Sequence, residues 1–203
     1  MAAKLGAILL AAGASRRMGE SKQLLPVQGE PAVRFCIRQM RDAGLDTIIV
    51  VLGANREKIR PVLADLPVGI AVNPCLKSHM AESVSKGLAQ MPAYVTGIMV
   101  ALCDHPLVSP QTYAALDACH YQAPEAILLP VYQARGGHPT VFPRTLCSAV
   151  DQGIPLNRVV HAHPESVRRI PINDPGIVQD MDTPADYQRM LSLADRQAEA
   201  ITG

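Results

Sequence analysis

LLAAGASRRMGESK, residues 9–22, is the stretch around which the rest of this chain is arranged. It begins inside a short, mostly apolar run from Lys4 to Leu10 that lacks the stripe of an amphipathic helix. Such a run predicts a strand buried on both faces. Gly13 ends the run, and the next periodic apolar segment begins only at about Pro31. The sequence therefore predicts a buried strand that opens directly into a long cationic loop.

The composition of this loop is typical of a polyphosphate-binding site. Gly13 and Gly19 allow backbone N–H groups to approach a ligand closely, and Arg17 and Lys22 carry charge that would neutralise phosphates. The P-loop motif does not fit, because five residues separate the glycines and Glu20 follows them. The dinucleotide motif G-x-G-x-x-G is also absent from the loop. A solvated basic loop after a strand is the alternative that the spacing alone leaves open.

Beyond the loop, β-branched apolar runs alternate with amphipathic segments, which predicts an α/β chain. We predict strands at about residues 47–52, 69–72, 97–102, 126–130, 140–142 and 167–172. We predict helices at about residues 31–43, 56–63, 80–91, 109–118, 143–151 and from 184 onward. This alternation favours a doubly wound, mostly parallel sheet with helices on both faces and a ligand crevice at the carboxyl ends of its strands. A length of 203 residues predicts a single domain over residues 1–203.

Composition excludes several classes of protein. Hydrophobic residues make up 48% of the chain and charged residues 18%, which excludes a disordered or fibrous chain. A net charge of +1, no Trp and two Phe argue against binding of nucleic acid. The five cysteines are scattered and odd in number, which is typical of reduced intracellular thiols.

The N-terminus imitates a signal peptide, with Lys4 followed by an apolar run over residues 5–12. We reject that interpretation because the run is short, the charged region is one lysine, and cleavage would destroy the loop. No other segment approaches the ~18 uninterrupted apolar residues of a membrane span. We therefore expect a cytoplasmic protein with no membrane partner.

Carboxylates follow the predicted strands at two places and suggest a Mg²⁺ site. Asp104 comes directly after the strand at 97–102, and Mg²⁺ prefers one or two protein carboxylates with phosphates and water. The alternative is a turn or helix-capping aspartate before Pro106. Asp180 and Asp182 lie two apart, so in an extended segment either could share the metal with Asp104.

The cationic loop resembles LAAGxSxRMGxxK, the opening signature of the MobA-like NTP transferases, most closely the molybdenum cofactor cytidylyltransferase branch. The matching residues are Leu10, Ala11, Ala12, Gly13, Ser15, Arg17, Met18, Gly19 and Lys22. The resemblance implies the Rossmann-like nucleotide-diphospho-sugar transferase fold. It also implies that Arg17 and Lys22 hold the triphosphate while residues 10–13 contact the base, for which LAAG favours cytosine.

The same resemblance adds two polar residues on the nucleotide side of the site. Asn73 and Ser83 fit an N-x-x-x-x-x-G-M-x-x-S pattern whose polar groups face the nucleotide. His79 stands where that pattern has its glycine. A larger side chain there would narrow the nucleotide pocket or alter the choice of base, unless it points outward.

On the acceptor side, the resemblance points to His138 and Arg158. His138 lies in a turn similar to the family's RGHP, where a structural histidine is the alternative. Arg158 is the one residue of the GDxGAR segment that can be placed, and Ile154 stands where that segment has its aspartate. The segment before the last helix resembles DIDTPEDY and favours Asp182 over Asp180 as the metal ligand.

Together these features imply Mg²⁺-dependent transfer of CMP from CTP to a phosphorylated acceptor such as molybdopterin, with release of pyrophosphate. Asp104 and Asp182 would hold the metal, and Arg17 and Lys22 would stabilise charge on the leaving group. No general base is needed, because the acceptor phosphate is already an anion. The resemblance also implies onward transfer to a molybdoenzyme or its chaperone. Two alternatives remain: a sugar 1-phosphate or another metabolite as the acceptor, and binding of nucleotide or molybdopterin without turnover.

Overall fold

Strand β1 (Leu5–Ala11) lies at the centre of the sheet, where alternate residues pack into separate hydrophobic clusters. Ala7 and Leu9 belong to the cluster on one face, whereas Ile8 belongs to the cluster on the other. The structure, a computed structural model, describes residues 3–13, 15, 18–75 and 79–202, and the side chains among them only as far as residue 194. The buried strand predicted from the sequence is confirmed.

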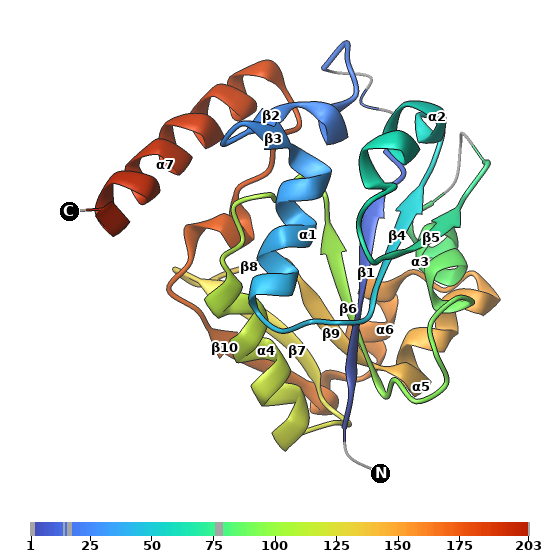
Figure 1. The fold of residues 1–203 in the computed structure, drawn as a ribbon. Coiled ribbons are helices and arrows are strands. Elements are labelled where there is room, and N and C mark those ends of the chain that lie inside the picture. The colour runs from blue at the N-terminus through green and yellow to red at the C-terminus, as the bar shows by residue number, and fades with distance from the viewer. Residues whose placement is uncertain (1–2, 14, 16–17, 76–78, 203) are drawn as a thin grey trace.

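In the part of the chain that the structure describes, eight strands form the sheet in the order β10, β7, β9, β6, β1, β4, β5, with β8 paired to β7 (Figure 1). Their bounds are β1 Leu5–Ala11, β4 Ile48–Leu52, β5 Gly69–Val72, β6 Gly97–Leu102, β7 Ile127–Tyr132, β8 Arg135–Gly136, β9 Thr140–Pro143 and β10 Val167–Pro171. Strand β9 runs antiparallel to both β6 and β7, whereas β5, β4, β1 and β6 are parallel. The prediction of a mostly parallel sheet is confirmed.

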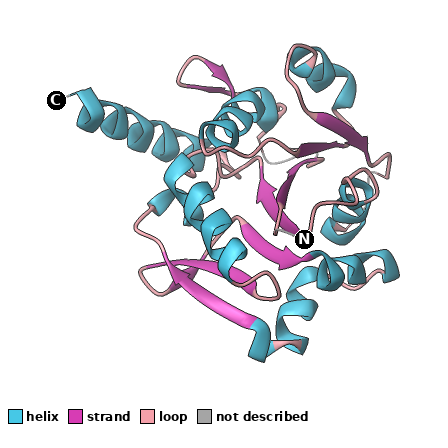
Figure 2. Cartoon of the chain, turned by 60° about the horizontal axis from the view of Figure 1, so that its bottom comes forward, coloured by secondary structure: helices cyan, strands magenta, loops and turns pink. Residues whose placement is uncertain are grey.

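Helices cover both faces of this sheet (Figures 1 and 2). The α-helices are α1 Ala32–Asp42, α2 Arg56–Ile59, α3 Met80–Leu88, α4 Pro110–Gln122, α5 Arg144–Cys147, α6 Leu156–Ala162 and α7 Pro184–Thr202. The described residues also form the 3₁₀ helices η1 Lys22–Leu24, η2 Arg60–Leu63, η3 Ser148–Gln152, η4 Pro164–Ser166 and η5 Pro175–Val178. Side chains of α1 and α4 enter one cluster, and those of α3, α5 and α6 enter the other. No described helix is long and apolar enough to cross a membrane.

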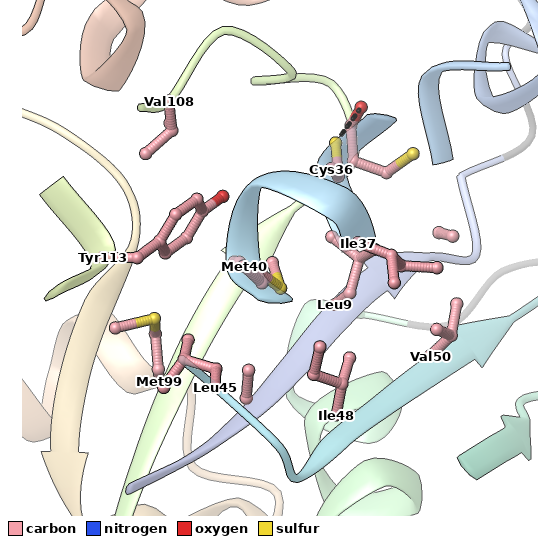
Figure 3. Close-up of a cluster of buried hydrophobic side chains, with 14 of the residues drawn as sticks. Leu9, Cys36, Ile37, Met40, Leu45, Ile48, Val50, Met99, Val108 and Tyr113 are labelled. Carbon is pink, nitrogen blue, oxygen red and sulfur yellow. Dashed lines mark hydrogen bonds between the residues drawn. The ribbon is translucent and has the colours of Figure 1, made fainter. Parts of the chain in front are cut away.

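Figure 3 shows how α1 attaches to the sheet. Ile37 and Met40 are fully buried on one face of α1 and pack with Leu9, Ile48 and Val50 from the two central strands. Removing such a side chain from water contributes about 1.5–3 kcal/mol. This packing fixes the edge of the sheet from which the cationic loop emerges.

A smaller cluster brings the last part of the chain to the same edge. It joins Phe35 of α1 and Leu107, which follows β6, to Met181 and Met190 around the start of α7. Val27 contributes from a hairpin of two short strands, β2 (Pro26–Val27) and β3 (Glu30–Pro31), which the sequence did not predict. The cluster therefore holds the segment before α7 close to the end of β6.

Asp174 ties the same segment to the start of α4. Its buried carboxylate accepts hydrogen bonds from Ser109 N at 2.9 Å, Thr112 Oγ1 at 2.6 Å and Gly176 N at 2.8 Å. We expect Asp174→Ala to lower the free energy of unfolding by about 3 kcal/mol, because three donors lose a charged acceptor. Urea denaturation checks this value. Asp180→Ala, at an exposed site, should change it by at most about 0.5 kcal/mol, and an equal loss in both variants would contradict the role given to Asp174.

Candidate active site

The fold places Lys22 against two aspartates from distant parts of the chain. Lys22 Nζ donates to Asp104 Oδ2 at 2.5 Å and to Asp182 Oδ1 at 2.9 Å. Asp104 follows β6, and Asp182 lies between η5 and α7. The backbone links these two segments as well, because Met181 N donates to Asp104 O at 3.0 Å. Three of the residues predicted to act together are therefore neighbours.

The charge of Lys22 is stabilised by its two partners. Burial acts to lower the pKa of Lys22, but the neighbouring carboxylates of Asp104 and Asp182 outweigh it, so the pKa is raised above its usual value. The lysine side chain is 12% exposed, and those of Asp104 and Asp182 are 22% and 31% exposed. Lys22 is thus a charged group at neutral pH, partly shielded from water but open to a ligand on one side.

A cavity of about 230 Å³ adjoins this cluster at the carboxyl ends of β1 and β6. Its lining residues are Leu10, Ala12, Gly13, Lys22, Gln23, Met80, Ser83, Leu102, Cys103 and Asp104. One part of the lining is apolar and the other carries the lysine and a carboxylate. The apolar part suits the base of a nucleotide, and the charged part suits its phosphate chain. Of the base-contacting residues predicted at 10–13, Ala11 is not in the lining and its side chain is buried.

Gln23 braces the start of the loop, and sequence analysis missed it. Its buried side chain donates from Nε2 to Ala11 O at 3.1 Å and to Gly13 O at 2.8 Å. Its Oε1 accepts from Ser21 Oγ at 2.7 Å and from Ser15 Oγ at 3.3 Å. The only signal in the sequence is an amide next to Lys22, and an amide can serve acceptors and donors at the same time.

Ser15, predicted to bind nucleotide, belongs to the same network of hydrogen bonds. Its Oγ accepts from Lys22 N at 3.0 Å, so the loop closes back on its own start. Ser15 adopts a φ of 52°, a left-handed conformation that a non-glycine residue seldom takes. Arg17, predicted to hold the triphosphate, lies outside the described residues.

Asn73 and Ser83, predicted to face the nucleotide, are hydrogen-bonded to each other. Asn73 Nδ2 donates to Ser83 Oγ at 3.0 Å, and Asn73 Oδ1 accepts from Cys75 N at 3.2 Å. Asn73 is only 2% exposed, whereas Ser83 lines the cavity. Asn73 therefore orients Ser83 in this structure. His79 is exposed and is not part of the cavity lining.

His138 lies beside His105, the residue that follows Asp104 in the chain. Their ring centroids are 5.4 Å apart with 63° between the ring planes. Nδ1 of each ring is buried and has no hydrogen-bond partner within the ranges that the structure describes. Burial, and next the neighbouring His105, lower the pKa of His138 to about 4. His138 is thus a neutral imidazole at the edge of the candidate site, and its contact with an acceptor stays a prediction.

The shifted pKa of His138 predicts a pH dependence of stability. Between pH 6.5 and about 4 the unfolded chain binds a proton that the folded chain does not. Lowering the pH through this window should therefore reduce the free energy of unfolding, by up to about 3 kcal/mol. Urea denaturation at several pH values checks it.

His138→Gln should remove most of this pH dependence. The exposed control His161→Gln should keep it. Buried His120, whose pKa is also lowered by burial, adds a smaller slope of the same sign to every curve. Equal slopes in the wild type and His138→Gln would contradict the prediction.

Arg158, the second predicted acceptor contact, lies elsewhere. It is an exposed residue of α6 and does not line the cavity. No hydrogen bond or ion pair joins it to the cluster in the part of the chain that is described. Its role in binding the acceptor stays a prediction.

The two carboxylates fit a divalent cation that also binds substrate phosphates. Both touch the same ammonium group, so they are close enough to share one ion. Asp104 Oδ1 is buried and lacks a hydrogen-bond partner among the described residues. The described residues contain no group of three or more His, Cys, Asp or Glu that could hold a metal. A site with two carboxylates suits Mg²⁺, which usually takes its remaining ligands from phosphates and water.

The fold and the cluster define a class of protein. Residues 7–166 match the model of the MobA-like NTP transferase domain. The chain belongs to the MobA-like NTP transferase family and is a nucleotidyltransferase. The family predicted from residues 9–22 is confirmed.

Individual relatives cover nearly the whole chain. Nicotine blue oxidoreductase from Paenarthrobacter nicotinovorans is 32% identical over 196 residues, covering 91% of this chain and 95% of the relative. The crystal structure of Rv0371c from Mycobacterium tuberculosis H37Rv has a TM-score of 0.82 at 29% identity, covering 94% of this chain and 98% of that one. A manganese complex of Rv0371c has a TM-score of 0.79 at 27% identity, covering 95% of this chain and 100% of that one.

More distant structures show the fold alone. A nucleotidyl transferase from Methanothermobacter, Mth528, has a TM-score of 0.83 at 20% identity, covering 96% of this chain and 99% of that one. The predicted nucleotide-diphospho-sugar transferase fold is confirmed.

Proposed function

We propose that this nucleotidyltransferase moves CMP from CTP to a phosphorylated small molecule of the molybdopterin type, with Mg²⁺ as its metal. The observation that carries the proposal is the cluster of Lys22, Asp104 and Asp182 beside a half-apolar cavity. The preference for CTP rests on the LAAG sequence that ends β1, whose resemblance to the cytidylyltransferases favours cytosine. Ala12 and Gly13 from that sequence line the cavity.

Each residue of the cluster has a role in this reaction. Lys22, together with Arg17, holds the triphosphate and stabilises the charge that develops on pyrophosphate as it leaves. Asp104 and Asp182 hold the divalent cation, a role supported by the manganese complex of the 27% identical Rv0371c. When bound, the cation would supply positive charge that lets two anionic phosphates approach each other.

The acceptor is a phosphate anion, so the reaction needs no residue to remove a proton from it. His138 contributes a neutral imidazole that lies beside His105, the residue after Asp104. A neutral imidazole can donate an N–H hydrogen bond to a phosphate oxygen without adding a positive charge to the site. Arg158 is the further candidate contact, from α6.

Two alternatives have specific support, whereas a third does not. Ile154 replaces the aspartate of the cytidylyltransferases' GDxGAR segment, which favours a sugar 1-phosphate or another metabolite as acceptor. The relative from Paenarthrobacter carries the name of an oxidoreductase and aligns with most of this chain. Binding without turnover is the third alternative, and retention of Lys22, Asp104 and Asp182 speaks against it.

Thermal unfolding with CTP, GTP, UTP and ATP tests the nucleotide. Each is added with Mg²⁺ and again with EDTA. A ligand at about 100 times its Kd adds about 2.7 kcal/mol of stability, a shift of several degrees in a protein of this size. We expect a Mg²⁺-dependent shift with CTP, and an equal or larger shift with another nucleotide would contradict the preference for cytosine.

Pyrophosphate release then tests the reaction and the acceptor. Release from CTP with molybdopterin is the expected result. Release only with a sugar 1-phosphate would show that the acceptor is a sugar 1-phosphate and not molybdopterin. No release with any acceptor, together with a measured oxidation or reduction of a substrate, would favour the oxidoreductase alternative. Binding of CTP without either reaction would favour a carrier.

A further inference from the structure

Lys22 occupies the position that the proposed function assigns to a cation. Its ammonium hydrogen-bonds both carboxylates at once, at 2.5 Å and 2.9 Å. In this arrangement the positive charge between Asp104 and Asp182 comes from the chain itself.

We infer that Lys22 is an internal counter-ion that keeps the metal site closed in the nucleotide-free protein and moves to the triphosphate when nucleotide and metal bind. This inference rests on the proposed function, because it takes Asp104 and Asp182 as metal ligands. It adds that metal and nucleotide bind cooperatively, and that Lys22 is the residue that couples them.

The atoms available to a cation support this exchange. Of the two oxygens of Asp104, Oδ1 is buried, and Oδ2 is the one that Lys22 holds. The same ammonium also holds Oδ1 of Asp182. A divalent cation that reached both aspartates would therefore meet the ammonium at close range. Two positive charges a few ångströms apart in a partly buried site repel each other strongly, so Lys22 must leave before the cation can be bound well.

After it leaves the carboxylates, the ammonium of Lys22 needs another anionic partner, because the Lys22 side chain is only 12% exposed to water in this site. The triphosphate of the bound nucleotide supplies that negative charge. Metal binding is then costly without nucleotide and favourable with it, which is positive coupling between the two ligands.

Only the end of the Lys22 side chain has to move. Its backbone is fixed by the bond from Lys22 N to Ser15 Oγ and by Leu25 N, which donates to Lys22 O at 3.3 Å. The next residue, Gln23, is pinned by its hydrogen bonds to the end of β1 and to the start of the loop. A lysine carries its charge on a flexible four-carbon stem with three rotatable donors, which suits such a transfer.

Binding of Mn²⁺ alone to the full chain, followed by electron paramagnetic resonance of the free ion, tests the inference without any turnover. Lys22→Gln removes the charge and nearly keeps the shape of the side chain. We expect this variant, in the absence of nucleotide, to bind Mn²⁺ about 5- to 150-fold more tightly than the wild type, the usual range of such coupling. Lys22→Arg keeps a charge that can hold both carboxylates, and it should behave like the wild type.

Lys4→Gln is the matched control. It removes the same charge from an exposed side chain just before β1, at the opposite edge of the sheet, and should leave Mn²⁺ affinity unchanged. Thermal unfolding gives a second readout. Without metal, Lys22→Gln should unfold at a lower temperature than the wild type because its carboxylates repel, and Mn²⁺ should raise its unfolding temperature by more.

The contrary outcomes separate this inference from the proposed function. Equal or weaker Mn²⁺ binding by folded Lys22→Gln would overturn the counter-ion role, whatever the pyrophosphate assay shows. Absence of Mn²⁺ binding in every variant would overturn both the counter-ion role and the metal site. Tighter binding by Lys22→Gln without any pyrophosphate release by the wild type would support the counter-ion role and contradict the proposed reaction.

Discussion

Asp104→Asn should slow nucleotidyl transfer by at least about 1,000-fold, because it removes a negative charge from the point where the proposed metal and the reacting phosphates meet. The fold should survive, since Asn has nearly the same shape and Lys22 keeps Asp182 as a partner. Pyrophosphate release under saturating CTP measures the rate, and thermal unfolding measures the fold.

Asp180→Asn is the control for this prediction. Asp180 is exposed and lies two residues before Asp182, so its loss should change the rate by less than about twofold. Asp182→Asn should resemble Asp104→Asn, because Lys22 contacts both carboxylates. Full activity in Asp104→Asn would remove this residue from the metal site. Loss of activity in Asp180→Asn but not in Asp182→Asn would make Asp180, and not Asp182, the metal ligand.

Gly53→Ala should both destabilise the protein and weaken binding of CTP. Gly53 follows β4, and a Cβ there would lie 2.3 Å from Ala12 O and 2.9 Å from Ala12 Cα. These are backbone atoms held by the pairing of Ala11 with Leu52, so the clash cannot be relieved by a side-chain rotation. We expect a loss of about 2–3 kcal/mol in the free energy of unfolding. Binding should weaken because Ala12 lines the cavity.

Urea denaturation and calorimetric titration with CTP measure the two effects. Gly136→Ala is the matched control, since the nearest atoms to its Cβ would be those of the Leu129 side chain, at 3.5 Å or more. That variant should be within about 0.5 kcal/mol of the wild type and bind CTP normally. Wild-type stability in Gly53→Ala would show that the strand ends can separate at low cost and would contradict the close packing of Gly53 against the backbone of Ala12.

Local patterns were sufficient for most of the fold. Strands β5 (Gly69–Val72) and β6 (Gly97–Leu102) begin and end at the predicted residues, because a short apolar run between turn residues has few other ways to be buried. The helix predicted at 143–151 is divided into α5 and η3, and α6 was not predicted. The loop at 9–22 indicated phosphate chemistry for a similarly local reason, namely glycines and cations within a few residues.

Within the site, the sequence by itself determined the kinds of residue present. It placed Asp104 at the end of a strand and cationic residues after β1, and it left Asp180 and Asp182 as equal candidates by geometry. The residue types limit the chemistry, since carboxylates and an ammonium can serve phosphates and metal but make a poor apolar core.

Which of these groups meet depends on contacts between segments that are distant in the chain. Strand β9 is inserted antiparallel between β6 and β7, the β2–β3 hairpin and α7 share one cluster with Leu107, and Gln23 fastens the loop to β1. The packing against Leu107 brings Asp182 to Lys22, 160 residues away in sequence. These contacts depend on the sum of many weak apolar interactions and on hydrogen bonds between segments that are distant in the chain. No local pattern encodes such contacts, and so Lys22 as the partner of both carboxylates emerged only once the chain was folded.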